Sequence, residues 1–125
     1  MPTKLRIIHF DVSQGESTLI SLIKGGTSTH VLIDGGKKCR GKYVARCLKR
    51  LGVTELAFIV CTHLDGDHHE GLEPVVRHPD ITTKKLLVPK FGYNKDKFDR
   101  LGKACDEEGV PYRVAKAGEF LLNDP

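Results

Sequence analysis

The stretch Thr62-His63-Leu64-Asp65-Gly66-Asp67-His68-His69-Glu70-Gly71 directly follows an apolar run from Leu56 to Cys61. A strand that ends in His-x-Asp-x-Asp-His presents imidazole nitrogens and carboxylate oxygens from one turn of backbone, and such mixed ligands suit zinc, manganese or iron. Gly66 lets the turn tighten, because glycine takes positive φ at little cost. The pattern predicts a metal-binding loop. The alternative is a polar loop with Asp67 as a helix N-cap and exposed histidines.

Two shorter motifs stand earlier in the chain, Phe10-Asp11-Val12-Ser13-Gln14-Gly15-Glu16-Ser17 and Leu32-Ile33-Asp34-Gly35-Gly36. With the His63–His68 segment they resemble motifs of the metallo-β-lactamase superfamily, in the same order. Within the superfamily they look most like the hydrolase domain of bacterial competence DNA-uptake proteins. The first motif resembles that group's Asp-Val-Gly-Gln-Gly-Asp-Ser, and the second resembles its Ile-Asp-Gly-Gly. The ligand segment resembles the superfamily's His-x-His-x-Asp-His with Asp in place of the second His, as in that group. The chain departs from this pattern at Ser13, at Glu16 and at His69-Glu70-Gly71, where an apolar residue and Gly-Gly are usual.

The resemblance implies a role for each matching residue. His63 and Asp65 would bind a first metal ion, and Asp67 and His68 a second, with Asp34 beside the site but outside the ligand set. Asp67 would also position the nucleophilic water. Zinc is the first expectation for the two ions, and manganese is the alternative because Asp65 adds an oxygen ligand where the superfamily has histidine.

The resemblance also implies a fold of the α/β (α+β) class. Residues 1–125 are expected to form a single domain, the N-terminal half of an αββα sandwich, with a mixed β-sheet covered by helices on one face. The superfamily's remaining ligands, a later His, a bridging acidic residue and a final His, find no match here. We therefore expect the domain to be truncated, with those ligands beyond residue 125.

Residue patterns predict the elements independently of the resemblance. Expected strands cover 5–10, 17–23, 29–33, 56–61, 85–88, 112–115 and 119–122, with a hairpin turn at Gly25-Gly26 and both faces of 56–61 buried. Expected helices run from Cys39 to Leu51 with Gly52 as C-terminal cap, from Asp67 or His68 to Arg77 or His78, and from a cap at Asn94 to Gly109.

Composition limits the possible partners. The formal net charge is +4, which permits an anionic substrate, nucleic acid among them, without requiring one. The basic residues between 37 and 50 are Lys37, Lys38, Arg40, Lys42, Arg46, Lys49 and Arg50. Those at 42, 46, 49 and 50 share one face of the expected helix, which either meets phosphates or is a solvated outer surface.

No apolar run reaches the ~18 residues of a membrane helix, and the N-terminus lacks the apolar core of a secretory signal. The cysteines at 39, 47, 61 and 105 have no CxxC spacing, so reduced structural thiols are expected. We expect a soluble, cytoplasmic chain.

Two functional hypotheses follow. The first is a metal-dependent hydrolase that uses a metal-activated water, with a phosphodiesterase or nuclease as the most specific form and with this chain alone a poor catalyst. The second is an incomplete half-domain that acts as a non-catalytic interaction or assembly module. An uncovered sheet face favours either a homo-oligomer or burial by a missing C-terminal half.

Overall fold

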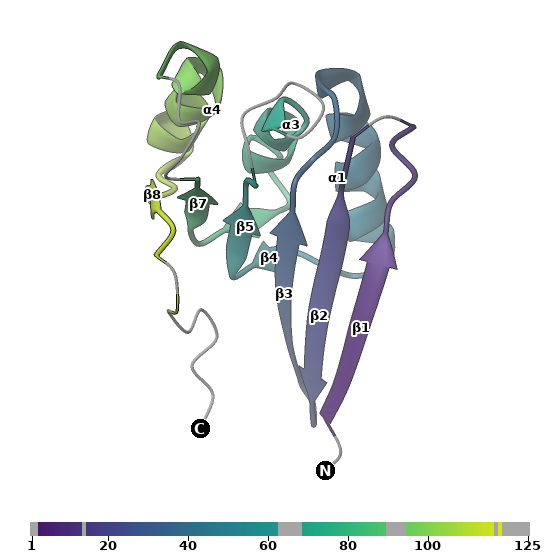
Figure 1. Cartoon of the computed structure of the whole chain (residues 1–125). Helices are drawn as coiled ribbons and strands as arrows, with labels where there is room; N and C mark the ends of the chain where they lie inside the picture. Colours follow the sequence, from purple (N-terminus) through teal and green to yellow (C-terminus); the bar gives the residue numbers. More distant parts are fainter. Residues whose placement is uncertain (1–2, 14, 63–68, 90–94, 117, 119–125) are drawn as a thin grey trace.

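The computed structural model describes residues 3–13, 15–62, 69–89, 95–116 and 118 (Figure 1). A six-stranded sheet has the order β1-β2-β3-β5-β7-β8. Its strands are β1 (Thr3–His9), β2 (Thr18–Lys24), β3 (Thr27–Ile33), β5 (Phe58–Val60), β7 (Leu86–Val88) and β8 (Tyr112–Val114). The first three form an antiparallel meander, and the last three continue the sheet in parallel from β3. A separate parallel pair joins β4 (Glu55–Leu56) to β6 (Thr82–Thr83).

The described helices are η1 (Lys38–Arg40), α1 (Gly41–Arg50), α3 (Leu72–Val76) and α4 (Lys95–Glu108). Along the sheet, α1, α3 and α4 follow one another in that order (Figure 1). No helix within the described ranges has the length and apolar content needed to cross a membrane. The expected mixed sheet with helices on one face is confirmed.

Successive side chains along each strand point to opposite faces of the sheet. Leu19, Leu32, Ile59 and Leu86 point to the helix side and belong to one core cluster. The helices supply the other side of this core with Val44, Leu48, Leu72, Val75, Leu101 and Cys105. Phe98, Leu101 and Cys105 share the buried face of α4, as the sequence predicts, and burial raises the pKa of the Cys105 thiol to about 12. None of the four cysteines, all of which lie within the described residues, forms a disulfide.

The glycines predicted to form a hairpin turn and to end two helices do so in the structure. Gly25 begins the β2–β3 turn at a φ of 61°, and Lys24 pairs with Thr27 across it. After α1, Gly52 at a φ of 77° donates to the Lys49 carbonyl while Val53 donates to that of Leu48, the pair of bonds that ends a helix in a left-handed cap. Gly109 and Val110 end α4 in the same way.

The predicted strand 56–61 is wrong as a single element. The chain divides at Ala57, whose N–H donates to the His30 carbonyl, so β4 and β5 belong to different sheets. Leu56 and Ile59 are both fully buried in one core although three positions apart. Because an unbroken strand would send them to opposite faces, the backbone has to turn between them. Phe58 and Val60 are only half-buried, so the expectation of two fully buried faces also fails.

The predicted helix from Asp67 or His68 to Arg77 or His78 is also interrupted. His69 is helical, Glu70 and Gly71 form a turn, and α3 begins at Leu72 and ends at the expected place, with Arg77 as its cap. Pro74 lies in the first turn of α3, where a missing N–H is tolerated. The expected start at 67 or 68, the cap at Asn94 and the strand 119–122 lie outside the described residues.

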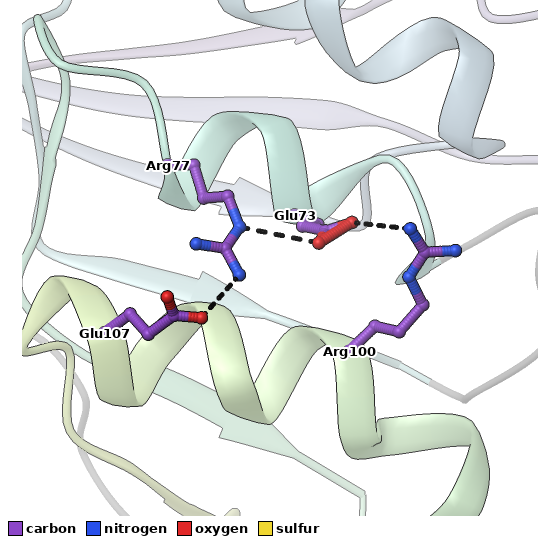
Figure 2. A network of polar contacts seen from close by, with 4 residues as sticks. All are labelled: Glu73, Arg77, Arg100 and Glu107. Atoms are coloured by element: carbon purple, nitrogen blue, oxygen red, sulfur yellow. Dashed lines mark hydrogen bonds and ion pairs between the residues drawn. The ribbon is translucent and has the colours of Figure 1, made fainter.

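An ionic network joins α3 to α4 (Figure 2). The Glu73 carboxylate, whose side chain is 17% exposed, lies 3.5 Å from Arg77 Nε and 3.8 Å from Arg100 Nη2. Arg77 Nη2 also lies 3.1 Å from Glu107 Oε1. Because Glu73 is shielded from solvent and contacts two guanidinium groups, it is the central member of this network.

Replacing Glu73 with Gln should lower Tm by roughly 4 °C, because a shielded acceptor loses its charge. The matched variant Glu107→Gln, at a side chain that is 50% exposed, should change Tm much less. Thermal unfolding followed by circular dichroism measures both. Equal Tm shifts in the two variants would show that the shielding of Glu73 does not add to its contribution to stability.

The other face of the sheet carries apolar side chains in contact with solvent. Leu5 is 64% exposed and Ile7 53% exposed, and they pair with Leu22 and Ile20 on the neighbouring strand. Ile33, Phe58 and Val60 extend the face and are half-buried. An apolar sheet face of this kind gains free energy when it is covered.

We expect the 125-residue chain to self-associate through this face. The double variant Leu5→Ser/Ile7→Ser should shift sedimentation toward monomer, because it removes apolar area from the contact. Leu51→Ser, at an exposed leucine after α1, is the control and should leave the distribution unchanged. A wild-type chain that stays monomeric at high concentration would refute the expectation.

Candidate functional site

The predicted metal ligands His63, Asp65, Asp67 and His68 all lie outside the described residues. Within the described ranges, no group of three or more His, Cys, Asp or Glu side chains could hold a metal ion. The ligand assignment therefore stays a prediction. The structure does describe the residues on both sides of the segment 63–68, namely Thr62 before it and His69 to Gly71 after it, and how the rest of the fold contacts them.

Topology places Thr62, the residue before this segment, beside Asp34. β3 and β5 are parallel neighbours, so Asp34 and Thr62, which follow them, leave the sheet at the same edge. The Asp34 N–H donates to the Val60 carbonyl and extends the pairing by one residue. The carboxyl ends of parallel strands are the usual place for ligands in such sheets.

Asp34 fixes the entry to the segment. Its carboxylate accepts the Thr62 N–H at 2.8 Å on Oδ1 and the Thr62 hydroxyl at 2.5 Å on Oδ2. The residue is 1% exposed, so these charge-assisted bonds offset the cost of removing a carboxylate from water. Asp34 also has a φ of 61°, a conformation that aspartate tolerates better than most residues. It thereby holds the residue immediately before His63.

Gly36 and Gly35 fix the exit. The Gly71 N–H donates to the Gly36 carbonyl at 2.9 Å. A Cβ on Gly71 would overlap the Gly35 carbonyl oxygen, and a Cβ on Gly35 would lie 2.7 Å from the Leu72 nitrogen. The two backbones therefore pack directly on each other, which only glycine permits. This contact turns the chain at Glu70-Gly71 and so interrupts the predicted helix.

Two hydrogen bonds join the first sequence motif to the second. Ser17 Oγ donates to the Asp34 carbonyl at 3.0 Å, and the Gly36 N–H donates to the Glu16 carbonyl at 2.9 Å. Ser13 has a φ of 67° and stands where the resembling motif has glycine. A serine in this left-handed conformation costs roughly 1 kcal/mol, which explains the usual glycine. Through these bonds, Glu16 and Ser17 hold residues 34–36, which in turn contact Thr62 and Gly71.

Three histidines outside the ligand-rich segment have polar partners within the fold. His9 Nδ1 lies 3.0 Å from Thr18 Oγ1, and His78 Nδ1 accepts the Asp80 N–H. His30 Nδ1 lies 2.7 Å from Ser21 Oγ, and burial, with a smaller effect from the charge of Arg6, lowers the pKa of His30. His69 is buried, and the sequence analysis assigned it no role. Its place directly after four potential ligands is the one signal that could have marked it.

Comparison with known proteins finds structures of similar fold and one relative that matches part of the chain. No family model matches the chain. It is 31% identical over 70 residues to ComE operon protein 3 of Bacillus subtilis (strain 168), a match that covers 56% of this chain and 9% of that protein. It is similar in structure to a Thermotoga maritima protein assigned as a metallo-β-lactamase, with a TM-score of 0.52 and 14% identity over 95% of this chain and 61% of that one. The metallo-β-lactamase FIM-1 from Pseudomonas aeruginosa, in a mono-zinc form, gives a TM-score of 0.46 and 15% identity over 94% and 46%.

The chain therefore has part of a metallo-β-lactamase fold, together with a local likeness to a competence protein. It spans less than two thirds of the length of each of these proteins. Both findings agree with what the three sequence motifs imply. The motifs and the structural comparison thus support the same fold by separate observations.

Replacing Asp34 with Asn should destabilise the metal-free chain by about 2 kcal/mol, because the buried charge that accepts two Thr62 bonds is lost. Asparagine tolerates positive φ equally well, so the variant tests the carboxylate and not the backbone. Asp11→Asn, at an exposed aspartate of the first motif, is the control and should change the free energy of unfolding by less than about 0.5 kcal/mol. Urea unfolding measures both, and equal losses would contradict the role of Asp34.

Proposed function

We propose that this chain supplies part of a metal-dependent hydrolase centre that cleaves phosphodiesters, as a phosphodiesterase or nuclease. The observation that carries the proposal is the frame around the segment 63–68. Asp34, Gly35 and Gly36 contact Thr62 at one end of it and Gly71 at the other. A fold that fixes both ends of a ligand-rich segment restricts the positions its side chains can take, which is what a metal centre requires.

The donor set fits the proposed ions. Two imidazoles and two carboxylates are ligands that zinc accepts, and the additional oxygen of Asp65 also suits manganese. When bound, such ions lower the pKa of a coordinated water to about 7 and stabilise charge on a phosphodiester. Likeness to a competence protein and to metallo-β-lactamase folds supports this chemistry.

This chain's residues would bind the ions, orient the attacking water and position the ligand segment. His63 and Asp65 would hold the first ion, and Asp67 and His68 the second. The second carboxylate oxygen of Asp67 would accept a hydrogen bond from the attacking water and orient it toward the phosphorus. Asp34 would act through Thr62, as a positioning residue that keeps the entry to the segment in place.

Two ligands per ion are fewer than a closed coordination shell needs. We therefore propose that the further ligands come from outside these 125 residues, in line with the 61% and 9% of the relatives' lengths that the chain matches. Catalysis by this chain alone should be weak, since looseness of about 1 Å can cost a factor of 10².

The alternative is a non-catalytic interaction or assembly module. The exposed leucine and isoleucine on β1 favour it, because an apolar sheet face is a surface for contact with another chain. Both functions can reside in one chain, but only the first requires that metal binding depend on Asp67.

The 125-residue chain loaded with manganese or zinc should hydrolyse bis(p-nitrophenyl) phosphate slowly, and Asp67→Ala should abolish this turnover. His63→Ala/Asp67→Ala should in addition lose bound metal in elemental analysis, because each ion loses one of its proposed ligands. Asp80→Ala, at an exposed aspartate that pairs with Lys49, is the control and should keep both properties. Unchanged metal content in the double variant would remove the ligand assignment and favour the non-catalytic alternative.

A further inference from the structure

Positive charge accumulates on the chain between Lys37 and Arg50. This segment contains the seven basic residues named above and no acidic residue. Four of them, Lys42, Arg46, Lys49 and Arg50, belong to α1. Helical pairs of opposite charge are therefore impossible within α1, so its cations must find partners elsewhere or stay uncompensated.

Some of these charges already have partners. Lys49 Nζ lies 2.8 Å from Asp80 Oδ2, and Arg40 Nη2 donates to the Ser13 hydroxyl at 3.0 Å. Lys42 and Arg46 are exposed, and neither forms an ion pair with any part of the chain that the structure describes. They are separated by one helical turn, about 6 Å along the axis of α1.

Both side chains border a groove of about 710 Å³ between α1 and the segment from α3 to Pro79. Ala45, Pro74 and Pro79 give this groove an apolar lining, and Glu73, Arg77 and His78 complete it. Glu73 and Arg77 belong to the network of Figure 2, in which two carboxylates balance two guanidinium groups. The net positive charge of the groove therefore comes from Lys42 and Arg46.

We propose that this groove binds the phosphodiester backbone of a nucleic-acid strand. Regularly spaced cations along a helix match a polymer with one negative charge per repeat, and Arg50 continues the row by a further turn. A single phosphate would engage only part of this row. The apolar lining accommodates sugar carbons between the phosphates.

The lining residues also indicate how the strand is read. None of the eight is Phe, Tyr or Trp, so the groove lacks a large stacking platform for bases, and contact through the backbone is independent of sequence. An acidic peptide is the competing occupant. Its carboxylates would need a particular fold or sequence to meet successive cations, whereas a phosphodiester strand meets them in any sequence.

The lining residues of this groove are not among the predicted metal ligands, and the proposal holds whether or not the segment 63–68 is catalytic. The test is fluorescence anisotropy of the whole 125-residue chain with a labelled, mixed-sequence single-stranded DNA in EDTA, so that metal plays no part. The variant Lys42→Ala/Arg46→Ala is compared with Lys4→Ala/Lys103→Ala, which removes two exposed cations on β1 and α4. Each pair lowers the formal net charge from +4 by 2, to +2.

We expect the groove variant to bind about tenfold more weakly, as two lost phosphate contacts imply, and the matched control to stay within about twofold of wild type. The slope of log K against log salt should become shallower by about 1.4 in the groove variant alone, from ~0.7 for each phosphate contact on single strands. A second DNA of unrelated sequence should behave alike.

Equal losses in the two variants would show that only net charge matters and would overturn the proposal. So would a glutamate-rich peptide that binds the groove as tightly as DNA and loses affinity in the same variant, or an absence of DNA binding by wild type. Circular dichroism and Tm verify that the variants fold. Lys42→Gln/Arg46→Gln repeats the test with longer side chains and should give the same loss.

Discussion

The direct backbone contact between Gly35 and Gly71 is the constraint on which the arrangement around the candidate site depends. A single methyl group on Gly71 would overlap the Gly35 carbonyl oxygen, so neither the strand end nor the turn can move without displacing the other. Gly41 at the start of α1 approaches the Gly71 carbonyl and Pro74 equally closely. Three elements, β3, α1 and α3, therefore converge where the ligand-rich segment rejoins the described fold. These contacts are made largely by backbone atoms, so a change of side-chain rotamer cannot relieve a clash there.

Local sequence predicted much of the fold because much of it is specified locally. Gly25-Gly26 turns a hairpin, Gly52 and Gly109 end helices, and Phe98, Leu101 and Cys105 recur at helical spacing on α4. The two errors have a long-range origin. Ala57 breaks a strand because Leu56 and Ile59 both enter one core, and Gly71 breaks a helix because it packs on Gly35. Neither contact is visible in the residues that surround the break.

The candidate site shows the same division. The residue types between His63 and His68 name a chemistry, and the resemblance assigned Asp34 a place beside it. Sequence could not identify Thr62 as the partner of Asp34, 28 residues away in the chain, because the pairing depends on β3 and β5 being neighbours in the sheet. Nor could it show why glycine usually occupies the position of Ser13, which a positive φ now explains. Two of the three motifs therefore contain no predicted ligand. The second supplies residues that contact the two ends of the ligand segment, and the first supplies residues that contact the second.

The distribution of polarity over the two sides of the sheet bears on how the functions can coexist. Leu5 and Ile7 make the side away from the helices apolar, whereas Lys42 and Arg46 make the helix side basic. Leu19, Leu32 and Val44 lie buried between these surfaces. A chain that covers the apolar face would therefore leave the groove between α1 and α3 open, since the sheet and its core separate them. Assembly and binding of an anionic strand need not compete, because they would use opposite sides of the sheet.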